Sequence, residues 1–479
     1  MTLTMKTFNG TAIDIPNGKL TSLQSSLRGK LINKADAGYD DARSLWNGMI
    51  DRRPGLIISA QDTNDIRLAV NFARENGLLL AVKSGGHQIA GHAVADGALL
   101  LNLSEMRGVH VDADKATAKV EPGCLLSDVD QETQRYGLAV PLGINSTTGV
   151  AGLTLGGGFG WITGKHGLTI DNLLSAEVIC ADGEVRVASA TQHADLFWAI
   201  RGGGGNFGVV SSFEFALHPI GPEVLSGLIV HPLADARGLL QSYRDICARA
   251  PDELTIWAVM RQAPPLPFIP EDWHGKEVLI FAACYAGDMK DGEKALEELR
   301  DLGNPLADVI GPHPYAGWQQ AFDPLLTPGA RNYWKSNDFL KLTDGVIDST
   351  LAAVVDLPDP QSEIFIAHLG GAMARVDPAA TPFPQRKRHF VMNVHTRWSE
   401  PAKDQTCIAW ARALFDRTAP DAAGSVYVNF MPSDDDGRMQ EAYGPNIEKL
   451  RRIKAEYDPK NLFRLNHNIN VEASEKLAT

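Results

Sequence analysis

A histidine directly follows a short glycine turn in the first quarter of the chain. An apolar run ends at Lys83, and Ser84, Gly85, Gly86 and His87 come next. Main-chain N–H groups and a lysine ammonium in one concave loop suit a pyrophosphate group. The same fragment also fits a tight turn followed by an ordinary surface histidine, so it does not decide the chemistry alone.

The residues before this loop predict the elements that position it. We expect a helix that begins with Thr63 as its N-cap, carries apolar residues at helical spacing and stops at Gly77. The unbroken apolar residues 78–82 then predict a buried strand. The histidine would therefore lie just beyond the end of a strand.

Two further glycine-rich segments follow along the chain. Residues 141–160 mix glycines with apolar residues and contain Gly-Gly-Gly-Phe-Gly at positions 156–160, and residues 201–210 contain four glycines in succession. Because glycine has no side chain, such segments let the backbone approach a large flat ligand closely. Three segments of this kind indicate one extended ligand site.

In their order and their amino-acid sequence, these segments resemble the flavoproteins of the vanillyl-alcohol oxidase superfamily, in the berberine-bridge-enzyme-like branch. The resemblance extends from about Trp46 to Ile469. It implies an α+β fold with a two-domain FAD-binding architecture and an antiparallel-sheet substrate domain that carries helices on one face. We place the first part of the FAD-binding domain at residues 1–220, the substrate domain at 221–424 and the return to the FAD-binding domain at 425–479.

The resemblance also implies how FAD is held. In this family, the histidine of the Lys/Arg-Ser-Gly-Gly-His motif is bonded to the flavin 8α-methyl group, and His87 occupies that position. Many relatives add a second bond from a cysteine, where this chain has Asn145, and a histidine near the flavin pyrimidine, where it has Leu153. The chain therefore looks like the singly attached members, such as the bacterial hydroxynicotine oxidases. The residues expected to contact FAD are Lys83, Ser84, Gly85, Gly86, His87, Gln88, Thr147, Thr148, Gly149, Gly152, Leu153, Gly157, Gly158, Phe159, Gly160, Val210, Asn429 and Asn468.

A tyrosine is the expected proton acceptor. Tyr427 and Asn429 match a Tyr-x-Asn strand that supplies a catalytic tyrosine in sugar- and alcohol-oxidising relatives. A phenol with a pKa near 10 is a weak base at neutral pH unless its surroundings lower that value. Asn393 stands where some relatives have a glutamine or glutamate, and His395 shares its strand parity, so both are further candidates. A purely structural role for Tyr427 remains the alternative.

The resemblance implies an oxidase. Hydride would pass from a C–OH or C–N group of a small organic substrate to flavin N5, and O2 would be reduced to H2O2. A small residue, Thr148, lies where relatives control oxygen access. A dehydrogenase with another acceptor and a flavin-binding protein without activity are the alternatives. The strand–Gly-x-Gly-x-x-Gly–helix unit of nicotinamide enzymes is not present in that form.

The second half of the chain has a different pattern of predicted strands, helices and loops. Strand-like runs at 228–230, 277–285, 363–369 and 389–394 alternate with helical stretches such as 292–302 and with proline-rich loops, which favours an antiparallel sheet covered by helices. Hairpins are expected over 109–120 and 176–187 in the first half. Aromatic residues expected in the loops of the second half are Phe268, Trp273, Tyr315, Trp318, Phe322, Tyr333 and Trp334.

Composition excludes several classes of protein. The 479 residues are too many for one typical core, and the net charge of −13 argues against nucleic acid or an anionic membrane surface as a partner. The five cysteines lack metal-ligand spacing, so we expect reduced thiols and no metal. With no run of transmembrane length and no signal-peptide pattern, a cytoplasmic monomer or homodimer is expected.

Overall fold

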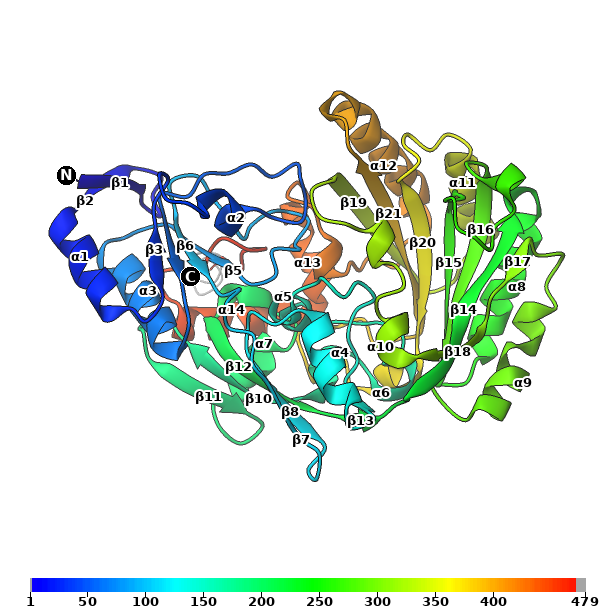
Figure 1. The fold of residues 1–479 in the computed structure, drawn as a ribbon, viewed down its shortest axis with the longest axis horizontal. Helices are drawn as coiled ribbons and strands as arrows, with labels where there is room; N and C mark the ends of the chain where they lie inside the picture. The colour runs from blue at the N-terminus through cyan, green and yellow to red at the C-terminus, as the bar shows by residue number, and fades with distance from the viewer. Residues whose placement is uncertain (1, 471–479) are drawn as a thin grey trace.

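The computed structural model describes residues 2–470 and shows two parts side by side (Figure 1). The N-terminal part carries a four-stranded and a five-stranded sheet besides smaller two-stranded ones, and the second part is built on one large sheet. The orange and red C-terminal segment, with helices α13 (Met439–Tyr443) and α14 (Ile447–Tyr457), returns to the first part. The predicted α+β architecture with a large antiparallel-sheet domain is confirmed.

The four-stranded sheet explains how the first glycine loop is positioned. Its order is β3-β4-β6-β5, with β4, β6 and β5 parallel, and helix α3 (Thr63–Glu75) connects β4 to β5. The N-cap of α3 is Asp62, whose carboxylate accepts a hydrogen bond from the Asp65 N–H, so the prediction of Thr63 as the cap was wrong by one residue. The strands are β3 (Lys30–Ile32), β4 (Leu56–Ser59), β5 (Leu80–Lys83) and β6 (Leu99–Asn102).

The five-stranded sheet carries both predicted hairpins, in the order β11-β10-β12-β8-β7. Strand β12 begins at Val209, at the end of the third glycine segment, and helix α5 (Val150–Leu155) begins after Gly149 in the second. The strands are β7 (Val109–Asp112), β8 (Thr117–Val120), β10 (Leu173–Ile179), β11 (Val185–Ser189) and β12 (Val209–Ala216).

Smaller elements complete the first part and its borders. They are β1 (Thr2–Lys6), β2 (Ala12–Pro16), α1 (Asn17–Ser26), α2 (Tyr39–Arg43), α4 (Leu126–Gln134), β9 (Leu138–Ala139), α6 (Thr163–His166), α7 (Ala194–Ile200), β13 (His218–Pro219) and α10 (Tyr315–Trp318).

The large sheet runs β17-β14-β16-β15-β20-β21-β19, with β18 also paired to β14, and its pairs are antiparallel. The four predicted strand runs lie in β14, β16, β20 and β21, whereas β15 and β19 were not predicted. Tyr333 and Trp334 lie on β19, which corrects their assignment to a loop. The strands are β14 (Glu223–Pro232), β15 (Leu254–Gln262), β16 (Glu277–Tyr285), β17 (Ala307–Asp308), β18 (Gly311–Pro314), β19 (Arg331–Phe339), β20 (Glu363–Leu369) and β21 (His389–Trp398).

The two faces of the large sheet differ because side chains alternate along a strand. Ile256, Ala258 and Met260 of β15 belong to a core shared with the covering helices. Trp257 and Val259 of the same strand point to the opposite face. The covering helices are α8 (Ala236–Arg249), α9 (Met289–Arg300), α11 (Asp344–Val354) and α12 (Asp404–Thr418).

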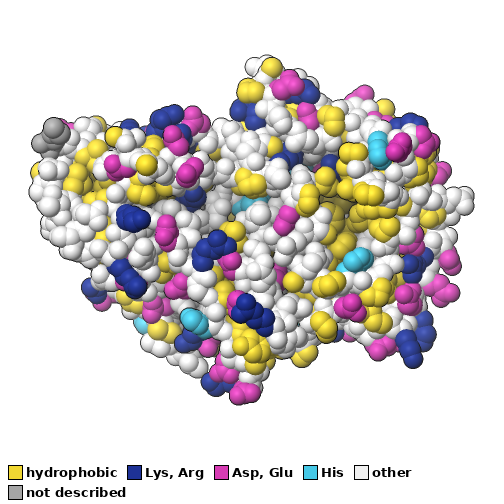
Figure 2. Space-filling model, viewed as in Figure 1, with side chains coloured by type: hydrophobic (Ala, Val, Ile, Leu, Met, Phe, Trp, Pro, Cys, Tyr) yellow, Lys and Arg dark blue, Asp and Glu magenta, His cyan; other side chains and the backbone are white. Residues whose placement is uncertain are grey.

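Acidic and basic side chains are interspersed over the face shown in Figure 2. Over residues 2–470, no helix is both long enough and apolar enough to cross a membrane. Within the same residues, no group of three or more His, Cys, Asp or Glu side chains could hold a metal ion.

Candidate functional site: a cavity between the two parts

A continuous cavity of about 380 Å³ lies between the glycine segments of the first part and the helix-free face of the large sheet. The structure brings all three glycine segments to it, together with residues 427–430 and 465–467. The predicted residues that line it are Ser84, Gly85, Gly86, His87, Gln88, Thr148, Gly149, Gly152, Leu153, Phe159, Val210, Asn393, His395, Tyr427 and Asn429.

Two of the glycine segments touch each other at Gly85 and Gly149. A Cβ atom added at Gly85 would lie 2.5 Å from the Gly149 nitrogen, and one added at Gly149 would lie 2.6 Å from the Gly85 nitrogen. Both neighbours are backbone, which cannot move aside cheaply. This contact explains why both positions require glycine.

Replacing Gly149 with alanine is expected to destabilise the protein by about 1–3 kcal/mol, the usual cost of overpacking, and to lower its FAD content. Thermal unfolding and flavin absorbance of the purified variant measure both effects. Gly238→Ala in α8 is the matched control, because a Cβ there meets nothing within 4 Å. Equal stability and FAD content in the two variants would contradict this account of the loop contact.

His87 is placed for chemistry on the wall of the cavity. Its ring stacks on Trp46 with 4.3 Å between centroids, and its Nε2 atom is buried without a hydrogen-bond partner among the described residues. Burial lowers the pKa of His87 to about 3, and repulsion from His395 and Arg397 adds to this effect. The imidazole is therefore neutral at physiological pH, and its nitrogen lone pair is available as a nucleophile.

Some predicted contact residues lie outside the cavity lining. Lys83 was expected to offer its ammonium to the first loop. Its Nζ donates to the Ala42 carbonyl at 2.7 Å, while its Cε lies close to Gly86 of that loop, so the contact with FAD stays a prediction. Burial lowers the pKa of Lys83 to about 8. The other predicted residues outside the lining are Thr147, Gly157, Gly158, Gly160 and Asn468.

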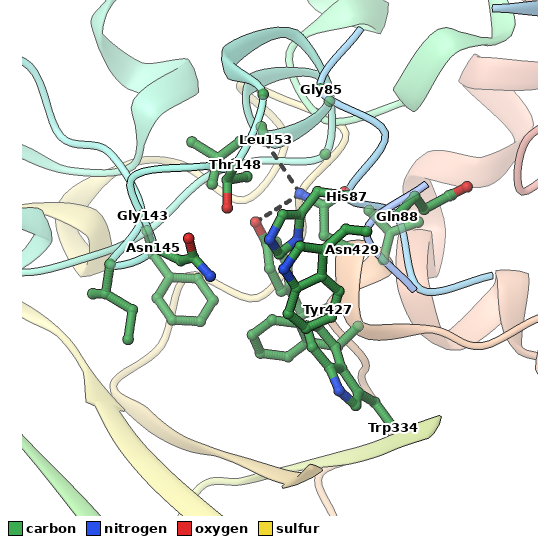
Figure 3. Close-up of a pocket in the computed structure, with 18 of the residues that line it drawn as sticks. Gly85, His87, Gln88, Gly143, Asn145, Thr148, Leu153, Trp334, Tyr427 and Asn429 are labelled. Atoms are coloured by element: carbon green, nitrogen blue, oxygen red, sulfur yellow. Dashed lines mark hydrogen bonds between the residues drawn. The ribbon is translucent and has the colours of Figure 1, made fainter. Parts of the chain in front are cut away.

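The position of the second attachment residue carries an amide. The Asn145 Oδ1 accepts hydrogen bonds from the Thr147 N–H and hydroxyl at 3.1 and 2.7 Å, and Figure 3 shows Asn145 beside Thr148. Cys124 lies next to this segment, since the Val150 N–H donates to its carbonyl. The Cys124 thiol, however, contacts the Gly108 carbonyl at 3.4 Å, and burial raises its pKa to about 12.

The Tyr427 hydroxyl accepts two hydrogen bonds. The Gly158 N–H donates from 3.0 Å. The Asn429 Nδ2 donates from 2.8 Å, a hydrogen bond that Figure 3 shows. Asn429 also donates to the Leu153 carbonyl at 3.2 Å, which fixes the orientation of its amide. Burial raises the pKa of Tyr427 to about 12, although the two donors oppose the shift. Tyr427 is followed by a short 3-10 helix, Val428–Phe430, so the predicted Tyr-x-Asn strand was wrong.

The sheet side of the cavity carries a charged pair, Arg261 and Glu363, that the sequence did not predict. The Arg261 Nη1 lies 2.6 Å from the Glu363 Oε2, and the His395 Nδ1 lies 3.5 Å from the Glu363 Oε1. Burial raises the pKa of Glu363, but Arg261 and His395 outweigh it and hold this pKa at about 2. The only indication of this charged pair in the sequence was a glutamate at the start of the otherwise largely apolar run 363–369.

The lining of the cavity fits a long cofactor with a flat ring. Glycines from all three segments line it together with mostly apolar side chains, and His87, whose buried Nε2 has no hydrogen-bond partner among the described residues, lines it too. Comparisons with known proteins also indicate an FAD-binding protein. Residues 54–189 match the model of an FAD binding domain, and residues 426–470 match the berberine and berberine-like model.

An uncharacterized FAD-linked oxidoreductase of Bacillus subtilis (strain 168) is 30% identical over 93% of this chain and 98% of its own length. The chain belongs to the berberine-bridge-enzyme-like FAD-linked oxidoreductases. The (R)-6-hydroxynicotine oxidase of Paenarthrobacter nicotinovorans is 29% identical over 94% of the chain and 98% of its own length. A crystal structure of 6-hydroxy-D-nicotine oxidase from Arthrobacter nicotinovorans matches with a TM-score of 0.83 at 27% identity, over 93% of this chain and 98% of that one.

Family membership makes FAD the cofactor and confirms the resemblance read from the glycine segments. In this berberine-bridge-enzyme-like chain, the loop of Ser84–Gln88 and the segment at Thr148 and Gly149 line the cavity from one side. Gly208, Val209 and Val210, from the third glycine segment, line it as well.

Proposed function

We propose that this protein is an oxidase whose FAD is attached through one covalent bond to His87. The neutral, unpartnered Nε2 of His87 supports the bond. The amide of Asn145 at the second attachment position, and the orientation of the Cys124 thiol toward Gly108, support a single bond. The nicotine-oxidising relative named above is similar over nearly its whole length, which supports oxidation of a small organic molecule.

The hydrogen bonds of Tyr427 are the observation that carries the catalytic proposal. When FAD is bound, it accepts two electrons from a substrate C–H bond. The proton of the reacting C–OH or C–N group needs a base beside it. Tyr427 lines the cavity, and the N–H groups of Gly158 and Asn429 point at its oxygen, so both stabilise the phenolate. Tyr427 would therefore take the proton, with His395 as the second candidate.

Molecular oxygen is the proposed electron acceptor. Thr148 lines the cavity and is small enough to leave room for O2 at the position that the resemblance assigns to oxygen access. A panel of alcohols and amines tests the proposal. A substrate should bleach the flavin anaerobically, and in air it should yield one H2O2 for each O2 consumed. Bleaching with no return of colour in air would indicate a dehydrogenase instead, and a panel that never bleaches the flavin would support a binding protein.

A further inference from the structure

A row of polar side chains crosses the sheet side of the cavity. Arg261, Glu363 and His395 are register partners on the adjacent strands β15, β20 and β21, and Trp334 of β19 follows as the partner of His395. All four line the cavity. Since partners in register lie side by side on the same face, the row forms one polar edge.

The next row on the same face is apolar apart from one amide. Val259, Phe365 and Asn393 are its members on the same three strands, and the Oδ1 of Asn393 is buried without a partner in the described part of the chain. Trp257 stacks on Phe365 with 5.4 Å between centroids and 10° between planes. A ligand between FAD and the sheet would therefore contact aromatic and aliphatic surfaces along its body.

The charge of this buried region is positive. Among residues 2–470, Glu363 is the only carboxylate that lines the cavity, and Arg261 already pairs with it. Arg397 lies two residues beyond His395 on β21 and is 2% exposed. Two positive guanidinium groups and one negative carboxylate thus lie in this region. Charges act over longer distances in the protein interior, where the dielectric constant is low, than in water. A cationic ligand is disfavoured here and an anionic one is favoured.

Arg261 has donors to spare for such a ligand. Its Nη1 donates to Glu363 at 2.6 Å and its Nε to the Gln262 carbonyl at 3.3 Å, while its Nη2 makes no hydrogen bond within the described residues. A guanidinium presents its N–H groups in a planar fork that suits a carboxylate or phenolate oxygen. Glu363 fixes the orientation of that fork, so it is a positioning residue.

We propose that the substrate is a flat, largely apolar molecule carrying an anionic oxygen group, a carboxylate or phenolate, that Arg261 binds. The inference rests on the proposed function, because it places this molecule on the substrate side of the FAD. It distinguishes the chain's substrate from cationic amines, which would meet the Arg261 guanidinium. It also distinguishes it from neutral polyols, whose hydroxyl groups would lack partners along the aromatic walls.

Three probes with one benzene ring test the charge preference on the FAD-loaded protein. Benzoate is anionic at pH 8, benzyl alcohol is neutral and benzylamine is cationic. Their dissociation constants are measured by flavin absorbance changes and by calorimetry. We expect benzoate to bind at least about tenfold more tightly than the other two, because a hydrogen bond to a charged group contributes this much or more. Equal affinities, tighter binding of benzylamine or no measurable benzoate binding would overturn the inference.

Variants assign the preference to Arg261. Arg261→Gln should weaken benzoate binding about 10–100-fold and leave benzyl alcohol unchanged, and Arg261→Lys should restore part of the loss. Because Arg261→Gln leaves Glu363 unpaired, the double variant Arg261→Gln/Glu363→Gln provides a neutral pair of similar shape. An intact spectrum of the oxidised flavin shows that each variant is folded, and unchanged benzoate affinity in folded variants would overturn the role of Arg261.

The probe experiment is independent of turnover. If no compound ever bleaches the flavin but benzoate still binds most tightly, the oxidase proposal fails and the anion site stands. If substrates are oxidised but the charge order is absent, only the present inference fails.

Discussion

Tyr427→Phe is expected to slow anaerobic reduction of the bound flavin by about 10²–10⁴-fold, the usual cost of removing a general base. The variant loses the oxygen that accepts hydrogen bonds from Gly158 and Asn429, while the ring keeps its packing against Phe159 and Phe430. Stopped-flow mixing with a substrate in the absence of O2 measures the rate, and the spectrum of the oxidised flavin should stay normal.

Tyr315→Phe is the matched control for this experiment. The Tyr315 hydroxyl is buried and has no hydrogen-bond partner in the described chain, and Tyr315 is not among the cavity residues. The control should reduce its flavin at the wild-type rate. If Tyr427→Phe also does so, the base lies elsewhere, and His395 becomes the next residue to replace.

The pH dependence provides a second signature of Tyr427. The active form is the phenolate, and burial raises the pKa of Tyr427 to about 12. The phenolate fraction therefore grows about tenfold for each pH unit below that value, so the reduction rate should rise through the alkaline range. Asn429→Leu removes a donor that lowers this pKa and should move the profile to higher pH. A rate that does not depend on pH in the wild-type protein would contradict the assignment.

His87→Ala is expected to remove all covalently attached flavin. The substitution deletes the only proposed attachment atom, the buried Nε2 that has no partner among the described residues. After acid precipitation, the wild-type pellet should stay yellow, and the flavin of the variant should pass into the supernatant. His110→Ala, at an exposed position on β7, is the control and should keep its yellow pellet. A yellow pellet from His87→Ala would contradict the assignment.

The glycine segments could be read from the sequence because their constraint is local. Gly85 and Gly149 each occupy a position where a Cβ would collide with backbone, and only glycine avoids that collision. Residues 277–285 and 363–369 could be read as strands because both are almost continuously apolar. These features revealed the fold and one side of the cavity.

Strand β19 could not be read in this way because it is rich in polar residues, several of which are bonded to distant partners. Lys335 pairs with Asp435, and the Asn332 N–H donates to the Asn47 Oδ1 at 3.0 Å. Asn337 donates to the Phe415 carbonyl at 3.1 Å. These hydrogen-bond partners are 285 and 78 positions away in the sequence. The residues around β19 therefore carry no local pattern that would predict a strand.

The missed parts of the site have the same cause. Lys83 follows the expected strand, but the Ala42 carbonyl determines where its ammonium lies. Arg261 and Glu363 were not predicted, because they come from two further strands and only the register of the sheet places them beside the predicted His395. No spacing within the sequence indicates that arrangement.

The mass of the proteolytic peptide that contains His87 tests the central claim most directly. The account predicts that this peptide, from untreated protein, carries one FAD, that fragmentation places it on the imidazole, and that the cysteine peptides are unmodified. An unmodified His87 peptide, an FMN-sized addition or a flavin on any cysteine would contradict the account.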